Sequence, residues 1–91
     1  YYDEGRTVAA ICGAPTVLAL SEVARGCRIT CHSSVREQMS GYEVVGGNVV
    51  EDGNLITGAG AGVSVEFALA VAARLVDEQT LARIKKGMEV A

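Results

Sequence analysis

The feature that most constrains this 91-residue chain is a short apolar run that stops at a cysteine. Residues 7–11, Thr-Val-Ala-Ala-Ile, predict a buried strand of a parallel sheet, and Cys12 follows directly. Gly13 and Ala14 are small, and Pro15 suits a first helical turn because its missing N–H would have no intrahelical acceptor there. The sequence therefore predicts a sharp strand-to-helix turn with a cysteine at its corner.

The same strand constrains how the domain is organised. A parallel strand that is covered on both faces needs neighbouring strands and helices, and the few residues before position 7 cannot supply them. We therefore expect residues 1–91 to form the carboxyl-terminal half of a single α/β domain, with an amino-terminal half that is missing or lies on another chain.

Hydrophobic spacing and turn residues predict the remaining elements. They are a helix over 16–25, a strand over 27–31, a short helix from a capping box at Ser34, a hairpin of 49–51 with 54–57 around Asp52-Gly53, an apolar helix over 63–76 and an amphipathic helix that opens at Asp77. The apolar helix carries few charges, so we expect it to be heavily buried.

Composition and charge argue against several classes of partner. A chain with 49% hydrophobic and 21% charged residues is typical of soluble globular proteins. The net charge of −3 argues against nucleic acid, and no apolar run approaches the ~20 residues of a membrane span. Three cysteines without a pairing pattern and a single histidine favour free thiols in a reducing compartment over structural zinc. We expect a cytoplasmic protein without a metal.

Cys12 is the candidate nucleophile. The predicted turn lifts its sulfur above the sheet edge, and the following helix directs its positive end and free N–H groups at that sulfur, which favours the thiolate. The backbone N–H of Gly13 is placed to donate to a developing oxyanion. The alternative is that Cys12 is a small buried hydrophobic residue, as most free cysteines are.

His32 is the candidate partner of Cys12, because it also directly follows a predicted strand. Sites in open α/β sheets form at the carboxyl ends of strands. If the two strands are parallel neighbours, the imidazole shares an edge with the thiol and could act as an acid/base or stabilise the thiolate. The alternative is a hydrogen-bonded structural histidine.

The glycine-rich stretch after the hairpin resembles a phosphate-binding turn, but its spacing is wrong. Val63 stands where a dinucleotide fingerprint would place its third glycine. We interpret Gly58, Ala59 and Gly60 instead as a pocket-lining segment in which the backbone passes close to the site. No organic cofactor is expected.

Four stretches carry a family resemblance: 8–15 (VAAICGAP), 29–32 (ITCH), 52–57 (DGNLIT) and 66–70 (EFALA). In this order they resemble successive motifs of the ThiJ/PfpI superfamily, and most closely its DJ-1-like clade. The resemblance covers nearly the whole chain. It implies a flavodoxin-like three-layer α/β sandwich, commonly a homodimer, of which this chain supplies the carboxyl-terminal half.

The resemblance also implies a function. It implies an easily oxidised nucleophile at Cys12, a nearby His32, and a glutamate from the amino-terminal half that is hydrogen-bonded to the sulfur. The implied activity is that of a glutathione-independent glyoxalase or deglycase, in which Cys12 adds to a small aldehyde such as methylglyoxal. The alternative is a non-catalytic redox sensor or protective chaperone that acts through oxidation of Cys12.

Three positions depart from the family pattern. PfpI-like peptidases place a histidine directly after the cysteine, so Gly13 argues against peptidase chemistry. Ser33 stands where DJ-1-like members often have proline, and Ala59 and Ala61 replace a longer polar residue and a proline in the glycine turn. These departures bear on the polarity and rigidity of the pocket.

Overall fold

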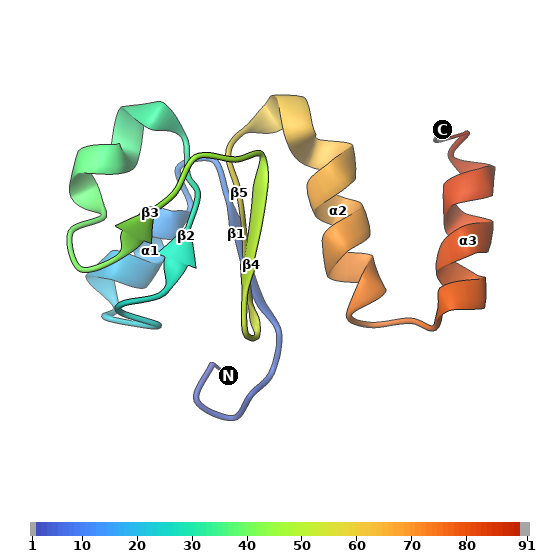
Figure 1. Ribbon diagram of the computed structural model, residues 1–91, viewed down its shortest axis with the longest axis horizontal. Helices are drawn as coiled ribbons and strands as arrows, with labels where there is room; N and C mark the ends of the chain where they lie inside the picture. Colours follow the sequence, from blue (N-terminus) through green and yellow to red (C-terminus); the bar gives the residue numbers. More distant parts are fainter. Residues whose placement is uncertain (1, 90–91) are drawn as a thin grey trace.

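A three-stranded sheet of order β1-β5-β4 lies at the centre of the computed structural model, which describes residues 2–89 (Figure 1). β1 (Val8–Ile11) runs parallel to β5 (Leu55–Gly58), and β4 (Val49–Asp52) pairs with β5 in the antiparallel sense. Ile11 lies opposite Gly58, so the two parallel strands end side by side. The prediction of a strand before Cys12 is confirmed.

The predicted hairpin is present, with its turn one residue later than expected. Asp52 pairs with Leu55, so the turn residues are Gly53 and Asn54 rather than Asp52 and Gly53. Gly53 has a φ of +61°, a conformation that glycine adopts without steric cost at the first position of a tight turn.

A second, smaller sheet joins β2 (Arg28–Ile29) to β3 (Glu43–Val44) in parallel. The expected strand over 27–31 is therefore shorter, and it pairs with β3 rather than with β1. Side chains link the two sheets, because the Thr30 N–H donates to Thr57 Oγ1 at 2.9 Å and the Arg28 N–H donates to Asp52 Oδ2 at 2.8 Å.

The helix after the cysteine, α1 (Pro15–Leu20), is shorter than the predicted 16–25. It ends in a Schellman motif, in which the Val23 N–H donates to the Leu18 carbonyl at 2.9 Å and the Glu22 N–H to the Ala19 carbonyl at 3.2 Å. Glu22 holds the left-handed position of this motif with a φ of +54°, where glycine is usual. The prediction that the helix continues to Arg25 was wrong.

The segment after His32 forms a 3₁₀ helix, η1 (Ser33–Gln38), instead of a helix capped by Ser34. Its N-cap is His32, whose side chain accepts a hydrogen bond from the Ser34 N–H. The capping-box prediction thus found a helix start but assigned the cap to the wrong residue.

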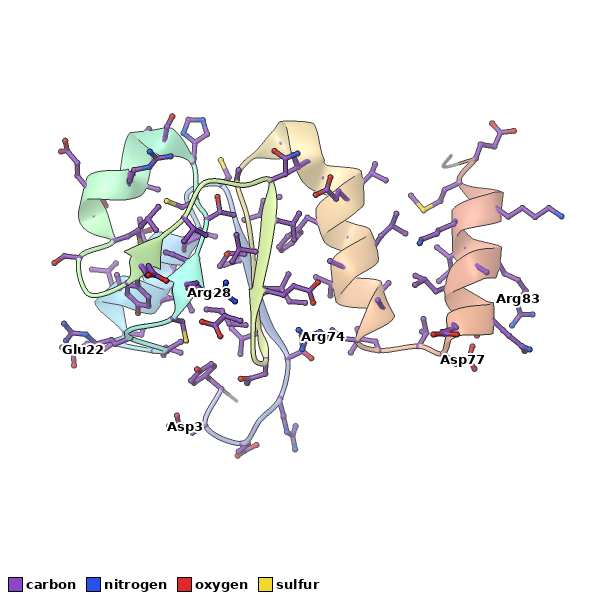
Figure 2. The ribbon with its side chains drawn as sticks, viewed as in Figure 1. Asp3, Glu22, Arg28, Arg74, Asp77 and Arg83 are labelled. Carbon is purple, nitrogen blue, oxygen red and sulfur yellow. The ribbon has the colours of Figure 1, made fainter. Side chains whose placement is uncertain are left out.

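α2 (Ser64–Ala73) follows the short helix η2 (Ala61–Val63) and packs on the face of the sheet opposite α1 and η1 (Figure 1). α3 (Glu78–Gly87) lies beyond α2, and the prediction of a helix that opens at Asp77 is confirmed. No residue of α2 is buried, so the expectation of heavy burial was wrong; the helix is covered on its sheet side and only partly by α3. At its end, Arg74 reaches back to the sheet (Figure 2) and donates from Nε and Nη2 to Glu51 Oε1 at 3.0 and 2.9 Å.

The hydrophobic core lies between the sheet and the α1–η1 layer. Its buried members are Leu18, Ala24, Ile29, Cys31, Met39 and Leu55. Within the described residues, no helix has the length and apolar character needed to cross a bilayer.

Candidate active site

Cys12 lies at the corner between β1 and α1 in a strained backbone conformation. Its φ of +62° is in the left-handed region, which costs an L-residue about 1–2 kcal/mol. The Cys12 N–H donates to the Gly58 carbonyl at 2.9 Å, and its own carbonyl accepts the His32 N–H at 2.8 Å. Neighbouring segments thus hold both main-chain groups of residue 12, which is the condition under which such strain persists at functional sites.

The surroundings of the Cys12 thiol include a free hydrogen-bond donor. Cys12 is half-buried. Within residues 2–89 the N–H of Gly13 has no hydrogen-bond acceptor, whereas the Gly13 carbonyl accepts from both the main-chain N–H and the hydroxyl of Thr16, at 3.2 and 2.8 Å. The corner therefore presents a thiol and an adjacent unused N–H.

His32 lies beside Cys12, although not by the route expected. β1 and β2 belong to different sheets, so the two residues are not at the ends of neighbouring strands. The 2.8 Å main-chain bond brings His32 to the corner instead, with its side chain exposed. The imidazole Nδ1 accepts the Ser34 N–H at 3.1 Å and lies 2.8 Å from Ser34 Oγ.

Ser34 is the neighbour of the site that the sequence reasoning missed. Its spacing to Glu37 had assigned it to helix capping alone. The sequence carries no clear signal for this contact, because histidine, which is the N-cap of η1 in the structure, is not among the residues preferred at that position.

The glycine segment after β5 passes close to both candidate residues. A Cβ at Gly58 would lie 2.7 Å from Phe67 Cδ1 and 3.0 Å from Ile11 Cγ1, so only glycine fits there. A Cβ at Gly60 would lie 3.6 Å from His32 Cδ2, which places Gly60 against the imidazole edge. Ala59 is tied to the segment before β4, because its N–H donates to the Asn48 carbonyl at 2.9 Å.

The other two cysteines have different surroundings. Cys27 Sγ lies 3.2 Å from the hydroxyl of Tyr2, and this hydrogen bond raises the pKa of Tyr2 above 10.0. Cys31 is only 3% exposed, and burial raises the pKa of its thiol above 9.0. In the described part of the chain, no three His, Cys, Asp or Glu side chains gather as a metal site would require.

Two surface hollows of the described residues lie outside this cluster. One of about 490 Å³ is bordered by Asn48, residues 61–66 and Leu69, and one of about 360 Å³ lies between Tyr2 and the segment at the end of α1. Neither is lined by Cys12 or His32.

These features define an α/β protein with a strained cysteine on a strand-to-helix elbow, joined through its main chain to a histidine and a glycine. The sequence profile of the DJ-1/PfpI family matches residues 1–74, and the chain belongs to that family.

Relatives and solved structures agree with this placement. The chain is 44% identical over 89 residues to Protein dj-1beta of Drosophila melanogaster, a match that covers 96% of this chain and 48% of the relative. It is 39% identical over 69 residues to the glutathione-independent glyoxalase DJR-1.2 of Caenorhabditis elegans, covering 74% of this chain and 37% of the relative. The crystal structure of Drosophila melanogaster DJ-1beta matches with a TM-score of 0.92 at 43% identity, covering 98% of this chain and 49% of that one.

The fold is therefore the flavodoxin-like α/β fold of this family, of which the chain covers a part. It spans about half the length of the first relatives that it matches.

Proposed function

We propose that this protein is a cofactor-independent thiol enzyme that acts on small reactive carbonyls, with Cys12 as its nucleophile. The observation that carries the proposal is the strained corner at Cys12, with a φ of +62° and both main-chain groups held by Gly58 and His32. Strain of this kind concentrates where a side chain must be presented for chemistry. The similarity to the glutathione-independent glyoxalase DJR-1.2 of Caenorhabditis elegans supports the substrate class.

The proposed reaction converts methylglyoxal and water to lactate. Cys12 Sγ bonds to the aldehyde carbon while the carbonyl π bond breaks, and the oxygen takes the thiol proton to give a hemithioacetal. The hydrogen on that carbon then moves to the neighbouring ketone carbon through an enediol, which yields a thioester. Water cleaves the carbon–sulfur bond, releases lactate and restores the thiol. No electron acceptor is consumed.

Three groups assist this chemistry in the proposal. The free N–H of Gly13 donates to the developing oxyanion, which is the largest kind of electrostatic assistance in acyl and carbonyl chemistry. His32 interacts with the substrate oxygens, and the segment of Gly58, Ala59 and Gly60 forms a wall of the pocket. The base for the carbon-bound hydrogen is the glutamate that the family resemblance assigns to the amino-terminal half.

The complete site therefore includes residues beyond those of this chain. β1 lies at the edge of the described sheet, which supports an amino-terminal half packed against this edge. Assembly of the complete domain as a homodimer and a cytoplasmic location stay predictions.

The test is lactate formation from methylglyoxal by the complete domain, with both halves present. We expect turnover that disappears in Cys12→Ser and falls strongly in His32→Ala, while Cys27→Ser serves as the control and keeps its rate. Absence of lactate from the unaltered protein would overturn the proposal. If Cys12 is then still oxidised rapidly by peroxide, the redox-sensor alternative takes its place.

A further inference from the structure

The neutral imidazole of His32 is held as one tautomer by its neighbour Ser34. The Ser34 main-chain N–H donates to Nδ1 at 3.1 Å, and a main-chain N–H can only donate, so Nδ1 presents its lone pair. The Ser34 hydroxyl lies 2.8 Å from the same atom, where its rotatable hydrogen shares that lone pair. A neutral imidazole carries one N–H, and here that hydrogen belongs to Nε2.

The Cδ2 edge of the ring lies next to Gly60. A Cβ at Gly60 would lie 3.6 Å from Cδ2, the carbon bonded to Nε2, so Gly60 is close to this edge of the ring. The main chain of His32 is fixed to the Cys12 carbonyl at 2.8 Å. The neutral His32 side chain therefore carries an N–H, not a lone pair, at Nε2, on a residue whose main chain is bonded to Cys12.

We propose that Ser34 is a positioning residue that holds His32 as an Nε2–H hydrogen-bond donor to the substrate carbonyl oxygen. This inference rests on the proposed function and deepens it. In this arrangement His32 polarises the carbonyl and neither gains nor loses a proton during the cycle. A base role would require a lone pair on Nε2, and moving the hydrogen to Nδ1 would place two N–H groups against each other and remove the cap of η1.

Neighbouring Ser33 provides a matched control. It lies in the same helix, is equally exposed and makes no side-chain hydrogen bond to His32. Among the described residues, Ser34 alone places both a main-chain and a side-chain group at Nδ1.

The first experiment measures the hydrogen bond itself by ¹⁵N NMR of the complete domain, with the imidazole signals assigned through their loss in His32→Asn. We expect a protonated Nε2, an unprotonated Nδ1 and a through-bond ¹⁵N–¹⁵N coupling between the Ser34 amide and His32 Nδ1. A hydrogen on Nδ1, or the absence of this coupling, would overturn the inference whether or not the protein turns over methylglyoxal.

The second experiment separates a donor from a base by lactate formation. A glutamine amide can place an N–H near the position of Nε2 but cannot act as a base, so a donor role predicts that His32→Gln retains turnover within about tenfold while His32→Ala loses about a hundredfold. Equal losses in both variants would overturn the donor role, since a base contributes at least about a hundredfold.

Ser34→Ala should lower kcat about fivefold with little change in KM, as expected for one neutral hydrogen bond, and Ser34→Thr should restore it. Ser33→Ala should match the unaltered protein. Ser34→Ala with an unchanged kcat would contradict the positioning role. Failure of the unaltered protein to form lactate would instead count against the proposed function, and the NMR result would still decide how His32 is held.

Discussion

The main-chain N–H of His32 donates to the carbonyl oxygen of Cys12 at 2.8 Å, which joins the end of one sheet to the corner of another. On its other side, the Cys12 N–H donates to the Gly58 carbonyl at 2.9 Å. Main-chain hydrogen bonds therefore couple the three residues, so a change in the backbone of any of them is expected to alter the position of the thiol.

The strain at Cys12 predicts an unusual order of stabilities. Because glycine adopts positive φ without a Cβ penalty, Cys12→Gly should be more stable than Cys12→Ala by about 0.5–1 kcal/mol in urea unfolding. Cys27 has no positive φ and serves as the control, where Gly should be less stable than Ala by about the same amount. The same order at both positions would show that the corner is unstrained.

The close approach at Gly58 predicts a loss of stability in Gly58→Ala. The added methyl would lie 2.7 Å from Phe67 Cδ1, and overpacking of this kind costs about 1–3 kcal/mol. Gly62→Ala is the matched control, because its Cβ would meet nothing within 4 Å. Thermal unfolding of the two variants should separate them, and similar melting temperatures would contradict the packing described for β5 and α2.

Thr57 is fully buried, and we expect removal of its hydroxyl group to destabilise the protein more than removal of its methyl group. Thr57→Val keeps the volume but leaves the Thr30 N–H, now bonded at 2.9 Å, without an acceptor, which costs about 1–3 kcal/mol. Thr57→Ser keeps the hydroxyl and loses one methyl, for about 1 kcal/mol. Amide hydrogen exchange at Thr30 should accelerate in Thr57→Val and stay slow in Thr57→Ser; equal protection would refute the bond.

The N-cap of α3 predicts a pH dependence on the acid side. Asp77, labelled at the start of α3 in Figure 2, accepts the Thr80 N–H at 2.7 Å, and this bond lowers the pKa of the Asp77 carboxyl below 3.8. The charged form is favoured in the folded state, so its stabilising contribution is present above pH 3.8 and is lost as the pH falls through the lower folded pKa.

Two-dimensional NMR should show the Thr80 amide signal moving with a midpoint below 3.8. Asp77→Asn, which can still cap the helix but does not titrate, should abolish that movement. A midpoint at or above 3.8 in the unaltered protein would mean that the cap does not form.

The elements predicted correctly are those whose local sequence pattern favours the same conformation as the packing of the folded chain. β1 and the β4–β5 hairpin have apolar runs and a glycine turn, and both lie close to their predicted bounds. The end of α1 could not be predicted, because Glu22 and Ala24 adopt positive φ without being glycine. Only packing reveals why: Ala24, at 8% exposure, leaves the helical path to join the core.

The sequence predicted which residues form the candidate site, but not the strand pairing and hydrogen bonds that bring them together. Functional sites in α/β sheets lie at the carboxyl ends of strands, and this rule pointed to both Cys12 and His32. The pairing of β2 with β3 was not predicted, because β3 has only two residues and no local sequence signal. The contact between Ser34 and the imidazole depends on the path of η1, which no pattern of spacing encodes.

The anchoring of residue 12 has a practical consequence for crystallography. Because its N–H and carbonyl are both engaged by other segments, replacing the sulfur should leave the local chain path unchanged. Cys12→Ser or Cys12→Ala of the complete domain should therefore preserve the backbone conformation of the reactive centre. Soaking such crystals with a slowly reacting aldehyde should reveal how an unmodified carbonyl compound is oriented before any bond to the protein forms.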